Sequence, residues 1–91
     1  MAEIRYIVKS KSIATEENEN FKGSVHYCYH GKEDYHLSMW GEWHKYKAAR
    51  WELLEYGYKR ECDAKRNWSY NHPQNDKHWK TKVEILKITI K

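Results

Sequence analysis

Residues 25–40 read VHYCYHGKEDYHLSMW, and this stretch decides the expected fold. Apolar and polar residues alternate on both sides of a turn-forming segment, residues 31–34, which is typical of two strands joined in a hairpin. Both apolar sets share one face only if paired positions have equal parity, for example Tyr29 opposite Leu37. The sequence therefore predicts a loop of three or five residues rather than a tight two-residue turn.

The segments around this hairpin complete a small sheet. Residues 4–9 alternate as a half-buried strand, and the polar stretch 15–20 predicts a solvated loop. Residues 80–91 alternate as a last strand, with a change of phase between Ile85 and Leu86. That change predicts either a β-bulge or a strand that is buried in part on both faces.

A helical period begins at about Lys45. Tyr46, Ala49, Leu53 and Tyr56 fall on one stripe, so Tyr46 and the flanking Trp51 are expected in the core. Gly57 is expected to end the helix in the left-handed conformation.

Two charged or polar segments follow this helix. Residues 59–66 are compatible with a short helix or a loop, and residues 67–78 are expected to form a long loop. The predicted order is β-β-β-α-loop-β. This is an α+β fold in which a small, mostly antiparallel sheet packs on one main helix in two layers.

The chain has 91 residues, which predicts a single domain over 1–91. Aromatic residues make up 15% of it, enough for a core built on rings. It contains no apolar run of the roughly 20 residues that a membrane span needs. The first ten residues lack the apolar region of a secretory signal, and Cys28 and Cys62 form no disulfide framework. We therefore expect a cytoplasmic protein without a membrane partner.

The sequence offers little catalytic chemistry. The four glycines are isolated, so no phosphate-binding loop is present, and no carboxylate pair suggests acid–base catalysis. His26, Cys28 and His30 share one face of a strand, with His36 or Trp40 expected beside them. Same-face residues two apart lie about 6.6 Å apart and diverge, whereas zinc ligands converge on one point. We expect neither an enzyme nor a cofactor, and leave open a metal-stabilised hairpin.

Charge is distributed unevenly along the chain. Residues 1–43 carry a net charge of −2, whereas residues 44–91 carry twelve basic and six acidic residues, a net of +6. The basic residues of this second half are interleaved with Trp and Tyr, a combination that suits nucleic acid as well as protein hot spots. The expected binding residues are Arg60, Arg66, Trp68, Tyr70, Lys77, Trp79 and Lys80.

Residues 21–55 resemble AP2-type and integrase arm-type DNA-binding domains, in which a hairpin is followed by a short aromatic-containing strand and then by a helix that opens with Lys and Ala. The correspondence covers Val25–His30, Tyr35–Trp40 and the segment Lys45-Tyr46-Lys47-Ala48-Ala49-Arg50. The resemblance implies DNA binding by the sheet. Those families use basic strand residues, whereas the hairpin here is nearly neutral and carries His26, Cys28, His30 and His36.

The whole chain also resembles small bacteriophage proteins in its size and in its richness in Lys, Glu, Asn, Tyr and Trp. Such proteins often inhibit host defence, the anti-CRISPR proteins among them. This resemblance implies a non-enzymatic inhibitor of phage or mobile-element origin that occludes a nucleic-acid-handling defence complex. The alternative is a domain that binds DNA or RNA directly through its basic, aromatic surface. Either protein could act as a monomer or a homodimer.

Overall fold

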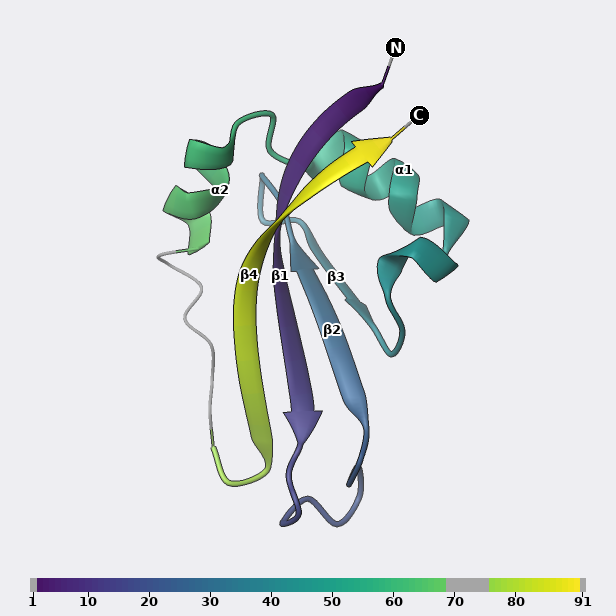
Figure 1. The fold of residues 1–91 in the computed structure, drawn as a ribbon, viewed down its shortest axis with the longest axis vertical. Helices are drawn as coiled ribbons and strands as arrows, with labels where there is room; N and C mark the ends of the chain where they lie inside the picture. The colour runs from purple at the N-terminus through teal and green to yellow at the C-terminus, as the bar shows by residue number, and fades with distance from the viewer. Residues whose placement is uncertain (1, 69–75, 91) are drawn as a thin grey trace.

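The computed structural model describes residues 2–68 and 76–90. Four strands form one antiparallel sheet in the order β3-β2-β1-β4, so the first strand of the chain is central (Figure 1). The predicted α+β fold is confirmed. The elements are β1 (Glu3–Ala14), β2 (Val25–His30), β3 (His36–Met39), a 3-10 turn (Trp43–Lys45), α1 (Lys47–Tyr56), α2 (Glu61–Trp68) and β4 (Trp79–Ile90).

The hairpin of β2 and β3 has the predicted register. Tyr29 lies opposite Leu37, and the last pair, His30 with His36, leaves a five-residue loop. Glu33 and Asp34 take up the turn with φ values of 57° and 59°, in the left-handed region that Asp adopts more readily than β-branched residues do. The parity of the apolar residues therefore predicted the register, and the observed loop is the longer of the two predicted lengths.

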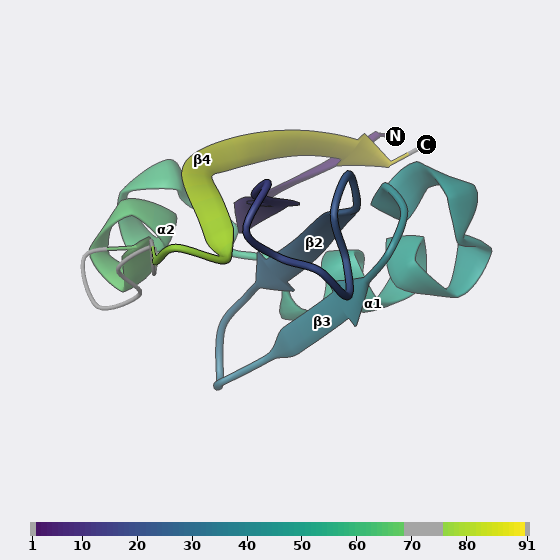
Figure 2. The ribbon, with the colours of Figure 1, turned by 90° about the horizontal axis from the view of Figure 1, so that it is seen from below.

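β1 and β4 form the long spine of the sheet. They pair from Glu3 opposite Ile90 to Ala14 opposite Trp79 without interruption, so no β-bulge separates Ile85 from Leu86. The alternative prediction is confirmed, because both of these residues are half-buried although their side chains point to opposite faces. The reason is that the sheet is covered by helices on both sides: α1 and α2 lie on opposite sides of it (Figure 2).

α1 buries a narrow stripe against the sheet. Leu53 is fully buried in a cluster with Ile7, Tyr29 and Ile88. The prediction that Tyr46 and Trp51 lie in the core is wrong, because their exposed fractions are 45% and 69%. Tyr46 precedes the helix. Trp51 is two residues away from the inward-facing Leu53, or about 200° around the helix.

The end of α1 depends on a close approach rather than on a left-handed residue. Gly57 has φ −71°, so the predicted left-handed conformation is wrong. A Cβ atom at Gly57 would lie 2.3 Å from the Leu53 carbonyl oxygen and 2.8 Å from Arg5 Cβ, contacts that only glycine avoids. The next residue, Tyr58, exchanges two backbone hydrogen bonds of 2.7 Å with Tyr6 of β1. The chain crosses here from the α1 side of the sheet to the α2 side.

The charged segment after Tyr58 forms α2, the helical alternative of the two considered, and Ala64 is its fully buried residue. Among the residues described, no helix is long and apolar enough to span a membrane.

Candidate functional site

Four lysines from the two ends of the chain lie on one face of the sheet. In the β1–β4 register Lys11 is opposite Lys82, Lys9 is opposite Glu84, and Ile13 is opposite Lys80. Directly paired residues of antiparallel strands project from the same face, and so do residues two apart on one strand. Lys9, Lys11, Lys80 and Lys82 therefore form one surface, which we call the lysine face.

The lysine face is ordered around Tyr27 of β2. Lys9 Nζ and Lys11 Nζ lie 5.0 Å and 6.0 Å from the centre of the Tyr27 ring, within or at the limit of cation–π range. Lys9 also pairs with Glu84 at 3.6 Å. Within the described part of the chain, Lys11, Lys80 and Lys82 have no ion-pair partner, and Lys80 and Lys82 are exposed.

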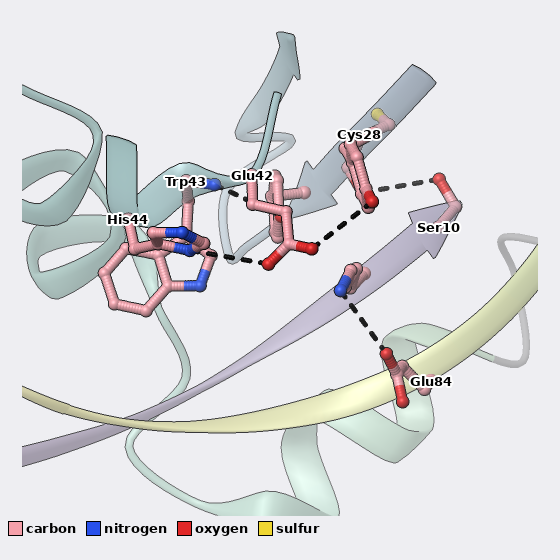
Figure 3. Close-up of polar contacts among 9 residues, drawn as sticks. Ser10, Cys28, Glu42, Trp43, His44 and Glu84 are labelled. Atoms are coloured by element: carbon pink, nitrogen blue, oxygen red, sulfur yellow. Dashed lines mark hydrogen bonds and ion pairs between the residues drawn. The ribbon is translucent and has the colours of Figure 1, made fainter. Parts of the chain in front are cut away.

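The acidic boundary of this face is Glu42. Its carboxylate accepts a hydrogen bond of 3.4 Å from the Tyr27 hydroxyl and lies 3.4 Å from His44 Nδ1 (Figure 3). Burial, with the charge of Glu42 added, raises the pKa of Tyr27 above its usual value. Tyr27 therefore stays a neutral hydrogen-bond donor at physiological pH.

The opposite face of the same part of the sheet carries an aromatic pocket of about 400 Å³. The Phe21 ring lies 5.5 Å from the Trp40 ring and 5.9 Å from the Trp79 ring, and His26 meets Trp40 edge-on at 4.8 Å. Phe21 and Trp40 are 44% and 57% exposed, so these rings are open to a partner. The residues lining the aromatic pocket are Ser12, Phe21, His26, Trp40, Asp76, Trp79 and Thr81.

Two polar residues position the rings of the aromatic pocket. Asn18 is buried in the loop after β1, donates to the His78 carbonyl at 3.1 Å and accepts from the Phe21 backbone N–H at 3.1 Å. Asp76 Oδ1 accepts the backbone N–H groups of His78 and Trp79 at 2.8 Å and 2.9 Å. These bonds lower the pKa of Asp76, so its carboxylate is ionised at neutral pH.

The predicted row of His26, Cys28 and His30 lies on one face, next to His36 of β3, as expected. Cys28 Sγ lies only 3.2 Å from His30 Nε2, closer than the spacing along the strand suggested, because the side chains lean together. Burial raises the pKa of Cys28 and lowers that of His30, which opposes thiolate formation. Among the described residues, no three His, Cys, Asp or Glu side chains are arranged to hold a metal ion.

The chain matches no protein-family model, no curated protein and no solved structure. Its function must therefore be inferred from its own residues.

The structure divides the predicted binding residues between two places. Lys77, Trp79 and Lys80 lie at the start of β4, where Trp79 and Lys80 project from opposite faces of the sheet. Arg60 and Arg66 lie just before and within α2, beside the other half of β4 (Figure 1). Trp68 is the last residue of α2. Tyr70 lies outside the described residues.

Several candidate residues escaped prediction. Lys9 and Lys11 belong to the half of the chain with a net charge of −2, and only the pairing of β1 with β4 brings them beside Lys82. Phe21 lies in a loop, where no periodicity marks it, and Trp40 was expected beside the histidine row but was not among the expected binding residues. The repeated Lys-x-Lys spacing in both strands was the available signal, because it places two lysines on one face of a strand.

Proposed function

We propose that this protein is a non-enzymatic binding domain that contacts nucleic acid through the lysine face. The observation that carries this proposal is the direct pairing of Lys11 with Lys82, beside Lys9 and Lys80. Like charges directly opposite one another destabilise a sheet. A polyanion would relieve this repulsion, because lysines neutralise phosphates and release the counterions condensed on them.

The shape of the surface also fits an extended polyanion. The exposed lysines of β4 are two residues apart and continue onto the neighbouring strand, so they form a row of charges rather than a pocket for one ion. The resemblance to arm-type domains pointed to the hairpin as the DNA-contacting surface. The lysine face lies instead on the β1–β4 pair.

The test is the salt dependence of binding to a short labelled single-stranded oligonucleotide, followed by fluorescence anisotropy. With Lys9 paired to Glu84, three lysines remain, and the slope of log affinity against log salt should be about −2, at about −0.7 per phosphate neutralised. Lys11→Gln with Lys82→Gln should reduce the slope to about −0.7. A matched pair of exposed lysines elsewhere, Lys59→Gln with Lys87→Gln, should leave it unchanged. Binding with a slope near zero, or equal effects of the two pairs, would contradict the proposal.

A second candidate function is the inhibition of a host nucleic-acid-handling defence complex, of the anti-CRISPR type, in the bacterial cytoplasm. It is favoured by a group of exposed residues at the start of α1, which we call the α1 patch: Tyr46, which precedes the helix, and Lys47, Arg50 and Trp51. Trp51 is the most exposed of the large hydrophobic residues described, and Arg50 lies 5.8 Å from the Trp43 ring. Exposed Trp, Tyr and Arg are the residue types that dominate protein–protein hot spots.

Inhibition can be tested directly with purified CRISPR effector complexes and their target cleavage assays. Trp51→Ala with Arg50→Ala should abolish inhibition and leave oligonucleotide binding intact, because the α1 patch shares no residue with the lysine face. Loss of inhibition in the Lys11→Gln, Lys82→Gln variant alone would assign the effect to nucleic-acid competition. If none of the complexes is inhibited by the unaltered protein, the second candidate is wrong.

A further inference from the structure

The aromatic pocket combines stacking surfaces with one anionic acceptor. Its rings come from the loop after β1, from β2, from the end of β3 and from β4, so residues distant in the sequence converge there. Its volume of about 400 Å³ lies within the range of roughly 300–1,000 Å³ that small-molecule sites have. Such a pocket fits a flat ring system that can lie against Trp40 or Phe21.

The polar groups of the aromatic pocket select among flat ligands. Asp76 uses Oδ1 for its two backbone contacts, and Oδ2 accepts no hydrogen bond from another described residue. Ser12 and Thr81 share a hydrogen bond of 2.9 Å at the floor. Burial and the charge of His36 lower the pKa of His26, so its ring is neutral at physiological pH. An ionised carboxylate beside neutral rings favours a ligand with an amino group that can donate to it.

The strand that supplies the aromatic pocket also supplies the lysine face. Trp79 and Thr81 point to the pocket, whereas the alternating Lys80 and Lys82 point to the other side of the sheet. β4 is an edge strand, so a ligand that follows this edge can reach both faces. A single-stranded nucleic acid offers the matching pair of groups, since its phosphates meet lysines while unstacked bases meet aromatic rings.

We propose that the aromatic pocket binds an unpaired nucleobase with an exocyclic amino group, such as cytosine, from a single strand whose phosphates lie on the lysine face. Asp76 accepts a hydrogen bond from the amino group, the contact by which Asp and Glu recognise cytosine N4. Trp40 supplies the stacking surface. This inference rests on the proposed nucleic-acid binding and adds a preference among bases to it.

The test compares oligo(dC) with oligo(dT) of equal length at one salt concentration. Oligo(dC) should bind more tightly, by about fivefold or more. Trp40→Ala should weaken oligo(dC) binding by about 5- to 150-fold, the contribution of one stacked base, without changing the salt slope. Asp76→Asn retains an oxygen for the two backbone N–H groups, but its amide also offers donors, so the preference for dC over dT should disappear or invert. Trp51→Ala, an exposed tryptophan on α1, is the matched control and should change nothing.

The outcomes separate this inference from the proposed function. Salt-dependent binding that is equal for oligo(dC) and oligo(dT), and insensitive to Trp40→Ala, would overturn the base site and leave the proposed function of the lysine face intact.

If neither oligonucleotide binds, the proposed function fails. The neutral nucleoside cytidine then tests the pocket alone, through the indole N–H signals of Trp40 and Trp79 in NMR spectra. Shifts with cytidine would retain the base site, and their absence would overturn it. Displacement of cytidine by tetramethylammonium, with tighter binding of the cation, would also overturn it and make the pocket an aromatic cage for ammonium groups.

Discussion

Replacing Lys82 with Glu should stabilise the fold and weaken nucleic-acid binding at the same time. Lys82 lies directly opposite Lys11, and pairs in this position have Cβ atoms about 4.5–5.5 Å apart. Lys82→Glu converts a repulsive pair into an attractive one. Since cross-strand charge pairs contribute roughly 0.2–1 kcal/mol each, the change of sign should raise the free energy of unfolding by about 0.5–1.5 kcal/mol.

The gain in stability is measured by urea unfolding and by the thermal midpoint. About 1 kcal/mol corresponds to a rise of roughly 4–8 °C for a domain of this size. Because Lys82 is exposed, the gain should shrink in molar salt, where the Debye length is about 3 Å. The same variant removes one cation from the lysine face, so the slope of log affinity against log salt should become less negative by about 0.7.

The matched control is Lys87→Glu. Lys87 is also exposed on β4, but it pairs with Tyr6 and projects from the other face. Its stability should change by less than about 0.5 kcal/mol, as for ordinary surface substitutions. If Lys82→Glu were neutral or destabilising like the control, the lysines would not be repelling each other, and the reasoning that assigns them to a polyanion would be refuted.

Three further substitutions or conditions test the core, the loop and the histidines. Leu53→Ala removes a fully buried side chain and should lower the free energy of unfolding by about 2–5 kcal/mol in urea titrations; a loss under about 1 kcal/mol would contradict the packing of α1. Asn18→Ala leaves the Phe21 backbone N–H and the His78 carbonyl without their side-chain partner, and it should lower the free energy of unfolding by about 1–3 kcal/mol in urea titrations without ligand. Burial first, and the charge of His36 second, lower the pKa values of His26 and His30 in the folded protein, so the unfolded chain binds more protons. The free energy of unfolding should therefore fall as the pH falls from about 7 through the depressed histidine pKa values. The slope should be at most about 1.4 kcal/mol per pH unit for each proton taken up. His30→Gln should make this dependence on pH less steep.

Much of the sheet could be predicted from the sequence because its hairpin alternates cleanly. The second half of β1 could not, since Lys9–Ala14 interleaves lysine and serine and lacks the apolar alternation that marks a half-buried strand. These residues form a strand because β2 and β4 supply hydrogen-bonding partners on both sides. Pairing between distant segments, rather than local preference, determines this part of the fold.

The candidate sites depend on the same distant pairing. Trp79 and Lys80 were identified from local composition, which is visible in one segment. The lysine face required knowledge that β1 lies beside β4, and the aromatic pocket required the position of Phe21, which Asn18 fixes from within a loop. Sequence reasoning identifies the chemical types of such residues more readily than the surfaces they share.

The central position of β1 has a consequence for synthesis on the ribosome. β1 is made first, yet its longest pairing, from Glu3 with Ile90 to Ala14 with Trp79, waits for the last strand to be translated. Until then the nascent chain carries an unpaired edge along a strand whose middle residues, Ile7 and Val8, are fully buried in the finished protein. Open edges of this kind recruit other chains. The yield of native protein should therefore depend on how rapidly translation reaches β4 and on chaperones that cover β1 in the interval.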